Sequence, residues 1–380
     1  MKPRHLYLHV PFCVRRCSYC DFAVDVTREA PVDSWLATVE AEMRHVVEAE
    51  GWSGSLELDT LYVGGGTPSL LGAGAMEALR RRLEPYVRLE NDAEWTVEAN
   101  PESFDREMAR AWRDAGVNRL SLGAQTFHEP ALRWMGRLHG PDGPARAVEA
   151  ARSAGIDNYS LDLIFGLPAR LGRDWSADLE RVLSLEPSHV SLYGLTAEPA
   201  TPLGRWVDEG RERLADEETY AAEYLEAAER LVGAGFVHYE VSNFARPGRE
   251  SRHNGAYWTG AAYLGLGASA HSFLPPVRRW NLRAWTAYRT AVLSGESAVA
   301  EREEVRGDAA RLESIWLGLR TRRGLSREGW SEAQARLAAD WVARGWAEPV
   351  ENGIRLTAAG WLLLDRLTLD FDAAAEEHRA

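Results

Sequence analysis

A strand-then-helix pattern repeated over residues 5–240 is the strongest constraint on how this chain can fold. Apolar residues alternate over short runs such as Leu6–Val10 and Leu58–Val63, and they recur at helical spacing in the stretches between the runs. The other expected strands are 94–98, 118–122, 160–165 and 189–193. Six strands separated by helices imply a parallel sheet, and that number suits a partial (β/α)6 TIM-like barrel.

The pattern changes after Pro275-Pro276. Helical segments are expected at 310–319, 327–333, 335–344 and 358–367, with a hairpin over 346–356 whose turn is Asn352-Gly353. This order resembles a winged helix. We therefore predict an α/β chain in three parts. They are a barrel over residues 1–235, a connecting segment over 236–300, and a C-terminal winged-helix-like α+β domain over 301–375.

The charge of the chain argues against nucleic acid as its partner. The formal net charge is −13 and the pI is about 5.4, whereas nucleic-acid binding needs concentrated positive charge. Arginines and acidic residues are equal in number between Arg306 and Asp372, so the winged-helix-like unit carries no net charge either. The sequence has neither an apolar run of membrane-spanning length nor the apolar core of a signal peptide, and we expect a cytoplasmic protein.

All three cysteines lie in one loop after the first strand, as Cys13-x3-Cys17-x2-Cys20. Three thiolates so close together have the number and softness to hold iron or zinc. An iron–sulfur cube usually takes four cysteines, so three would leave one iron open for chemistry. Two alternatives stay open at this point. One is a Cys3His zinc site that recruits His5 or His9, and the other is a disulfide that leaves one odd thiol.

Polar residues and glycines follow most of the predicted strands, at the face where barrel enzymes build their active sites. Glu98 could bind an ammonium group and Arg137 a carboxylate, so together they suit an amino-acid moiety. Gln125 and Asp162 either bind ribose hydroxyls or order the barrel interior. The run Gly64–Pro68 either lets a ligand approach the backbone closely or forms a tight barrel turn.

His253 opens the motif His253-Asn254-Gly255-Ala256-Tyr257-Trp258, which follows the barrel. The first loop contains every cysteine, so a haem bound elsewhere would need a His, Met or Tyr ligand. From composition alone, a histidine that is hydrogen-bonded within its loop is the default interpretation of His253.

Together, these motifs resemble the radical SAM superfamily, and within it the coproporphyrinogen dehydrogenase / HemW group. The resemblance covers nearly the whole chain, from Tyr7–Cys13 to His253–Trp258. The other matching segments are Gly64–Ser69, Glu98–Pro101, Gly116–Gln125, Gly136–His139, Leu161–Pro168, Ser191–Glu198 and His238–Phe244. So many motifs in one order make the resemblance specific, and zinc becomes a remote alternative.

The resemblance implies a [4Fe–4S] cluster on Cys13, Cys17 and Cys20, with S-adenosylmethionine (SAM) chelating the open iron. Reduction in this family cleaves SAM to methionine and a 5′-deoxyadenosyl radical. The residues that match SAM-contacting positions are Tyr7, Gly65, Gly66, Thr67, Glu98, Gln125, Arg137, Asp162 and Ala197. The roles expected from residue chemistry agree for Glu98 and Arg137, which would flank the amino-acid part of SAM.

Two departures from the dehydrogenase pattern decide which branch of the group the chain resembles. The dehydrogenase has a further cysteine where this chain has Phe22, and it has a long N-terminal extension where only a dozen residues precede Cys13. The resemblance therefore favours the haem chaperones of the group, which bind haem and pass it to acceptor proteins. The alternative is an oxygen-independent coproporphyrinogen III oxidase, which performs a radical oxidative decarboxylation.

The chaperone resemblance implies further partners and one haem ligand. His253 would be an axial ligand of the haem, and the acceptors would lie at the membrane. We also expect an electron donor, a monomer or weak homodimer, and peripheral association with the membrane. The resemblance leaves open whether the chain is an enzyme in any sense beyond SAM cleavage.

Overall fold

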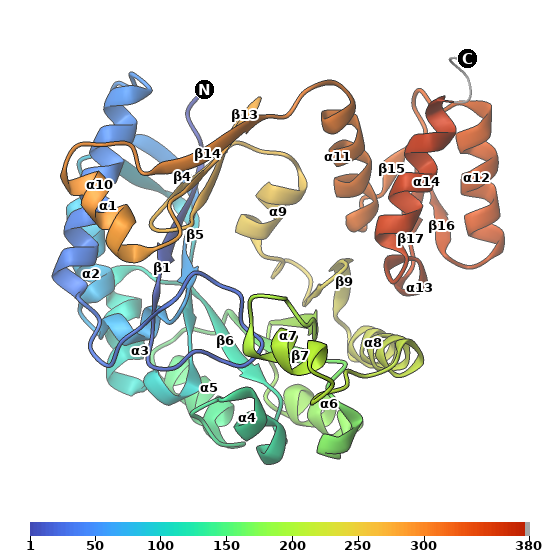
Figure 1. Cartoon of the computed structure of the whole chain (residues 1–380), viewed down its shortest axis with the longest axis horizontal. Coiled ribbons are helices and arrows are strands. Elements are labelled where there is room, and N and C mark those ends of the chain that lie inside the picture. The colour runs from blue at the N-terminus through green and yellow to red at the C-terminus, as the bar shows by residue number, and fades with distance from the viewer. Residues whose placement is uncertain (377–380) are drawn as a thin grey trace.

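The computed structural model describes residues 1–376, and one 12-stranded sheet dominates it (Figure 1). The six predicted strands lie side by side and parallel at the centre of this sheet, and the predicted partial (β/α)6 barrel is thereby confirmed. In spatial order they are β1 (His5–Val10), β4 (Leu56–Gly65), β5 (Val87–Ala99), β6 (Arg119–Gln125), β7 (Tyr159–Phe165) and β8 (His189–Gly194). A seventh strand, β11 (Tyr263–Leu266), extends the parallel run beside β1. The short strands β2 (Phe12–Cys13) and β3 (Asp25–Val26) pair separately and bracket the cysteine loop.

Helices follow the strands and cover the outer face of the barrel (Figure 1). They are α1 (Val32–Ala49), α2 (Ala75–Leu83), α3 (Arg106–Ala115), α4 (Glu129–Met135), α5 (Gly143–Ser153), α6 (Trp175–Ser184), α7 (Pro202–Asp208) and α8 (Glu217–Gly233). Their ends follow from local chemistry. The Asp105 carboxylate caps α3 by accepting from the Met108 N–H at 2.9 Å, and Gly116 ends that helix in the left-handed conformation.

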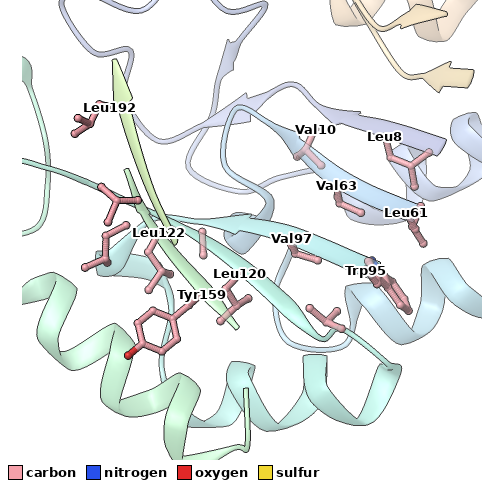
Figure 2. Packing of buried hydrophobic residues seen from close by; sticks show 14 of the residues in the cluster. Leu8, Val10, Leu61, Val63, Trp95, Val97, Leu120, Leu122, Tyr159 and Leu192 are labelled. Atoms are coloured by element: carbon pink, nitrogen blue, oxygen red, sulfur yellow. The ribbon is translucent and has the colours of Figure 1, made fainter. Parts of the chain in front are cut away.

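The core lies between the parallel strands and these helices. Figure 2 shows its apolar side chains on successive strands, from Leu8 and Val10 of β1 to Leu192 of β8. Trp95 on β5 and Trp112 on α3 are both fully buried in this layer. Burying an apolar side chain of this kind stabilises the fold by about 1.5–3 kcal/mol before entropy is counted, so the alternating sequence pattern fixes the register of each strand.

Residues 236–300 were predicted to be a connecting segment, but they add strands to both edges of the sheet. At the β8 edge lie β10 (Asn243–Ala245) and β9 (Val237–Glu240). At the β1 edge lie β11 (Tyr263–Leu266), β12 (His271–Leu274), β13 (Val277–Asn281) and β14 (Val299–Glu304), with α9 (Arg252–Trp258) and α10 (Trp285–Leu293) between the strands. These strands are only three to six residues long, and β13 and β14 are mostly half-exposed or exposed, so they lack the long apolar runs by which the central strands were found.

The C-terminal unit has the predicted winged-helix-like order. Its elements are α11 (Gly307–Arg320), β15 (Leu325–Ser326), α12 (Glu332–Ala343), β16 (Ala347–Val350), β17 (Gly353–Leu356), α13 (Ala358–Trp361) and α14 (Leu364–Glu376). The hairpin turn before Gly353 is confirmed. The helix predicted at 327–333 is wrong, because a turn follows β15 there. Helix α12 begins only after Ser331, which forms a capping box with Gln334.

Arg320 at the end of α11 joins this unit to the barrel. Its Nε lies 3.0 Å from Oε2 of Glu240, whose side chain is completely buried. The guanidinium also lies over the rings of Trp258, at 4.0 Å, and Trp316, at 5.1 Å. A buried charge must keep its partner, so this ion pair fixes where the C-terminal unit docks. Within the described residues, no helix combines the length and apolar character needed to cross a bilayer.

Candidate functional site

A cavity of about 520 Å³ lies at the carboxyl ends of the parallel strands, and Cys13, Cys17 and Cys20 all border it. We call it the cysteine cavity. Seven of the residues predicted to bind SAM also border it, namely Gly65, Gly66, Thr67, Glu98, Gln125, Arg137 and Asp162. The fold therefore gathers side chains from separate loops at the face where barrel active sites form.

Backbone hydrogen bonds hold the cysteine loop against the barrel. The Ser18 N–H donates to the Met135 carbonyl at 3.1 Å, and the Leu203 N–H donates to the Ser18 carbonyl at 2.8 Å. The Cys13 sulfur lies 3.3 Å from the Thr67 hydroxyl. Burial raises the pKa of Cys13 to about 11. This thiol therefore keeps its proton until a metal takes the place of the proton.

The histidines that a Cys3His zinc site would need are engaged elsewhere. Nδ1 of His5 lies 3.0 Å from the Thr60 hydroxyl. The two ring nitrogens of His9 lie 3.0 Å from the Tyr7 hydroxyl and 3.0 Å from the Ala23 carbonyl. In the described part of the chain, no three His, Cys, Asp or Glu side chains are grouped as ligands of a single metal ion. The three thiols border a cavity together, which suits a wider iron–sulfur cluster.

The glycine run packs so closely against its neighbours that no side chain fits. A Cβ on Gly64 would lie 2.8 Å from the Glu98 carboxyl, and one on Gly65 would lie 2.4 Å from the His9 ring. A Cβ on Gly66 would meet backbone oxygens at 2.7 and 2.8 Å. Gly65 also has a φ of +110°, which other residues rarely adopt. Of the two interpretations of this run, the tight turn accounts for all three glycines, and the turn forms part of the cavity wall.

Glu98 ends β5 with its carboxylate held inside the barrel mouth. The Tyr62 hydroxyl donates to Oε1 at 2.8 Å, and the Gly65 N–H donates to Oε2 at 2.9 Å. Burial raises the pKa of Glu98 to about 7, although both hydrogen bonds oppose the rise. A cationic ligand in the cavity would favour the ionised form, so the carboxylate is suited to receive an ammonium group.

Arg137 also borders the cysteine cavity, and its guanidinium is held in place by several contacts. Its Nη2 donates to Oδ1 of Asn100 at 2.7 Å and to the Gly123 carbonyl at 2.8 Å, and its Nη1 lies 3.9 Å from the Cys17 sulfur. The guanidinium is thus immobilised beside a cysteine of the loop. Because Glu98 and Arg137 border one cavity, the pair can bind the two charged ends of an amino acid.

Asp162 and Gln125 also border the cysteine cavity. Asp162 accepts hydrogen bonds from the hydroxyls of Ser121 at 2.8 Å and Ser160 at 3.0 Å, and burial raises its pKa. Gln125 has a φ of +64°, a strained conformation for a residue other than glycine. Asp162 therefore both orders the interior and faces the cavity, so the two alternatives left open for it do not exclude each other.

Two of the residues expected to contact SAM are not among the described residues that border the cysteine cavity. Ala197 packs beside a small apolar cluster, while its neighbours Thr196 and Glu198 border the cavity. Tyr7 borders a second cavity instead. Asn100 was missing from the predicted set although it positions Arg137, and its only sequence signal was the Asn-Pro pair after a strand.

The second cavity measures about 1070 Å³ and lies between the barrel and the C-terminal unit. We call it the interdomain cavity. Aromatic side chains from α9, β11, β12 and α11 border it, namely Tyr257, Trp258, Tyr263, Phe273 and Trp316. It shares four residues with the cysteine cavity, namely Asp21, Phe22, Gly65 and Glu98. The two cavities are therefore adjacent, with a common wall.

His253, the expected haem ligand, is buried behind this aromatic wall with 1 % of its surface exposed. Nδ1 lies 2.7 Å from the Thr60 hydroxyl and Nε2 lies 2.8 Å from the Tyr257 hydroxyl. Burial lowers the pKa of His253 to about 3. Both nitrogens are occupied, so the structure does not present this ring to a haem; the ring anchors Tyr257 instead. The default interpretation of a hydrogen-bonded histidine describes it better.

Comparison with known proteins gives a consistent picture. The model of the radical SAM superfamily matches residues 7–182. The chain is 33% identical to the haem chaperone HemW of Bacillus subtilis, over 94% of this chain and 96% of that protein. It is 35% identical to HemW of Mycobacterium tuberculosis, over 96% and 93% of the two chains. The solved coproporphyrinogen III oxidase of Escherichia coli shares the fold, with a TM-score of 0.81 at 23% identity over 98% of this chain and 90% of that one.

Proposed function

The chain belongs to the HemW family of the radical SAM superfamily, and we propose from this membership that it is a haem chaperone, which binds haem and delivers it to acceptor proteins. We further propose that it holds a [4Fe–4S] cluster and SAM. The observation that carries the proposal is the pair of adjacent cavities. One is bordered by three free thiols and the other is large and aromatic.

Cys13, Cys17 and Cys20 would hold the cluster, whose chemistry with SAM is the reductive release of a 5′-deoxyadenosyl radical. The chain's own residues prepare that site. The Thr67 hydroxyl approaches Cys13, and Arg137 places a positive charge near Cys17, where a reduced cluster would gain negative charge.

Glu98 would bind the amino group of SAM and Arg137 its carboxylate. Hydrogen bonds within the protein hold both side chains in place without a ligand, which supports this role. Asp162 would accept from a ribose hydroxyl, since it borders the cavity while Ser121 and Ser160 hold it in place. Preorganised partners of this kind lower the entropic cost of binding.

Phe22 favours the chaperone over a coproporphyrinogen oxidase. It occupies the position where the oxidase pattern has a further cysteine, and the residue is 61% exposed and borders both cavities. An apolar ring there can contact a flat macrocycle but offers no thiol to redox chemistry. We also propose a cytoplasmic protein, a monomer or weak homodimer, that takes an electron from a redox partner and meets its acceptors at the membrane.

The test is anaerobic reconstitution followed by two parallel assays. Haem is titrated while the Soret band is recorded, and coproporphyrinogen III is incubated with reductant and SAM while protoporphyrinogen formation is measured. We expect stoichiometric haem binding, transfer of that haem to an apo-haemoprotein, and no decarboxylation. Turnover of coproporphyrinogen, or failure to bind haem, would overturn the proposal.

A further inference from the structure

The interdomain cavity has the size and lining that a porphyrin needs. Binding pockets for small molecules usually measure about 300–1,000 Å³, and this cavity reaches about 1070 Å³. Trp258 and Trp316 approach each other across the domain boundary, with ring centroids 6.3 Å apart. Aromatic side chains contributed by both domains offer faces on which a flat conjugated ring can stack.

The His253–Trp258 motif contributes to this cavity through its last two residues. Tyr257 and Trp258 border the cavity, whereas His253 lies behind them and contacts the Tyr257 hydroxyl. The Arg320 guanidinium lies 4.0 Å from the centre of the Trp258 ring and contributes to holding that ring in place. The histidine of the motif is therefore a positioning residue for the wall, and an iron in the cavity would need another ligand.

Two other histidines border the interdomain cavity, and they differ in how they are engaged. Both nitrogens of His9 are occupied by the Tyr7 hydroxyl and the Ala23 carbonyl. His271, at the start of β12, stacks on Trp280 with the two planes 21° apart, and no hydrogen bond to its ring nitrogens is found within the described residues. His271 is exposed and borders the cavity, and partial desolvation lowers its pKa. A neutral imidazole with a free nitrogen is the form that ligates iron.

Positive charge is available at the same cavity for the carboxylates of a porphyrin. Arg278 and Arg283 both border it. Arg278 is paired with Glu303 at 2.9 Å and with Glu313 at 2.5 Å, and Arg283 is paired with Asp21 at 3.0 Å. The Arg283–Asp21 pair is exposed, at 56% and 41% of the two side chains, so an incoming carboxylate can exchange for Asp21 at little cost. Arg278 is 24% exposed, so its contacts with Glu303 and Glu313 are more costly to exchange.

We propose that the interdomain cavity is the haem site of this protein and that His271, not His253, supplies an axial ligand to the iron. This inference rests on the proposed chaperone function. It adds the location, the ligand and the roles of the aromatic wall. The macrocycle lies between α9 and α11, and its propionates face Arg278 and Arg283.

The ligand is tested with the full-length chain by comparing His271→Ala with His45→Ala under haem titration. His45 also borders a cavity, a different one, and its ring has no hydrogen bond within the described residues, so it is a matched control. We expect His271→Ala to shift the Soret band and to weaken haem binding at least tenfold, with His45→Ala unchanged. Thermal melting and iron–sulfur absorbance verify that both variants are folded.

The location is tested separately on helix α11. Ala309 borders the cavity, whereas Ser314 on the same helix is exposed and does not border it within the described residues. Ala309→Trp should reduce haem binding by filling the space, and Ser314→Trp should not.

The outcomes separate the two proposals. If the wild type binds no haem, the chaperone function fails. If the wild type binds haem but His271→Ala keeps both its spectrum and its affinity, the ligand assignment is wrong while the function stands. If Ala309→Trp binds as the wild type does, the haem lies elsewhere. A His271→Ala variant that fails to fold is replaced by His271→Gln, for which the same spectral shift is expected.

Discussion

Replacing Glu98 by glutamine should change the stability of the ligand-free protein in a pH-dependent way. The carboxyl group is buried and its pKa is raised to about 7 from an ordinary value of 4.5. The folded state therefore holds this proton more tightly than the unfolded state does. The free energy of unfolding of the wild type therefore falls as the pH rises from 4.5 to 7, and the full loss is present above pH 7. The Glu98→Gln variant cannot ionise and escapes the penalty.

The size of the effect follows from the two pKa values. At 1.36 kcal/mol for each pH unit, the wild type carries a penalty of about 2 kcal/mol at pH 6 and about 3.4 kcal/mol at pH 8.5. The variant loses part of the contact with the Gly65 N–H, but that loss does not depend on pH. The free energy of unfolding of Glu98→Gln relative to wild type should therefore rise by about 1.4 kcal/mol between pH 6 and pH 8.5.

Urea unfolding of protein freed of iron and SAM measures this difference at both pH values. Both lie above the pI of about 5.4, so the protein stays negatively charged throughout. Glu229→Gln, a change of an exposed residue on α8, is the control and should show no such trend. A stability difference for Glu98→Gln that is equal at the two pH values would refute the argument from burial. With the cluster restored, the same variant should bind SAM more weakly, because the ammonium group loses its counter-charge.

Three further changes test the site and the domain contact. Cys17→Ala leaves two thiols in the loop, and the reconstituted protein should lose its iron and its visible cluster absorption, as iron analysis would reveal. Gly65→Ala forces a Cβ to within 2.4 Å of the His9 ring at a φ of +110°; urea unfolding should show a loss of about 3 kcal/mol or more. Arg320→Met leaves the buried Glu240 carboxylate unpaired and should cost about 3 kcal/mol, most of which the added change Glu240→Gln should restore. Equal losses in the single and double variants would show that the ion pair does not fix the domain contact.

The barrel could be predicted because its central strands are buried on both faces. Ser160–Phe165 is mostly apolar for that reason, whereas Leu58–Val63 keeps a partly alternating pattern, and each lies within a strand of the structure. The edge strands escaped prediction because their burial depends on neighbours far away in the sequence. Strand β14 is almost entirely exposed and charged, and it is a strand only because β13 offers its edge. No local pattern carries that information.

The cysteine cavity was predictable for a related reason. In a parallel barrel, strand ends converge, so Glu98 and Asp162 had to lie near the cysteine loop once the strands were placed. The interdomain cavity was not predictable, since Trp316 and Phe273 come from elements whose docking no periodicity encodes. The same limit explains His253. The sequence motif places a histidine near two aromatic residues. Only the packing shows that Tyr257 and Trp258 border the cavity and that His253 does not.

The wall between the two cavities separates the proposed cluster and SAM site from the proposed haem site. Gly65 contributes only backbone to this wall, and the Glu98 carboxylate is tied to Tyr62. Asp21 is charged and paired with Arg283. Phe22 is therefore the one large apolar side chain among the four shared residues. A cluster in the smaller cavity and a macrocycle in the larger one would therefore face each other across this ring. In the oxidase pattern a thiol takes its place. The identity of this residue thus bears directly on whether the cargo is altered or only held.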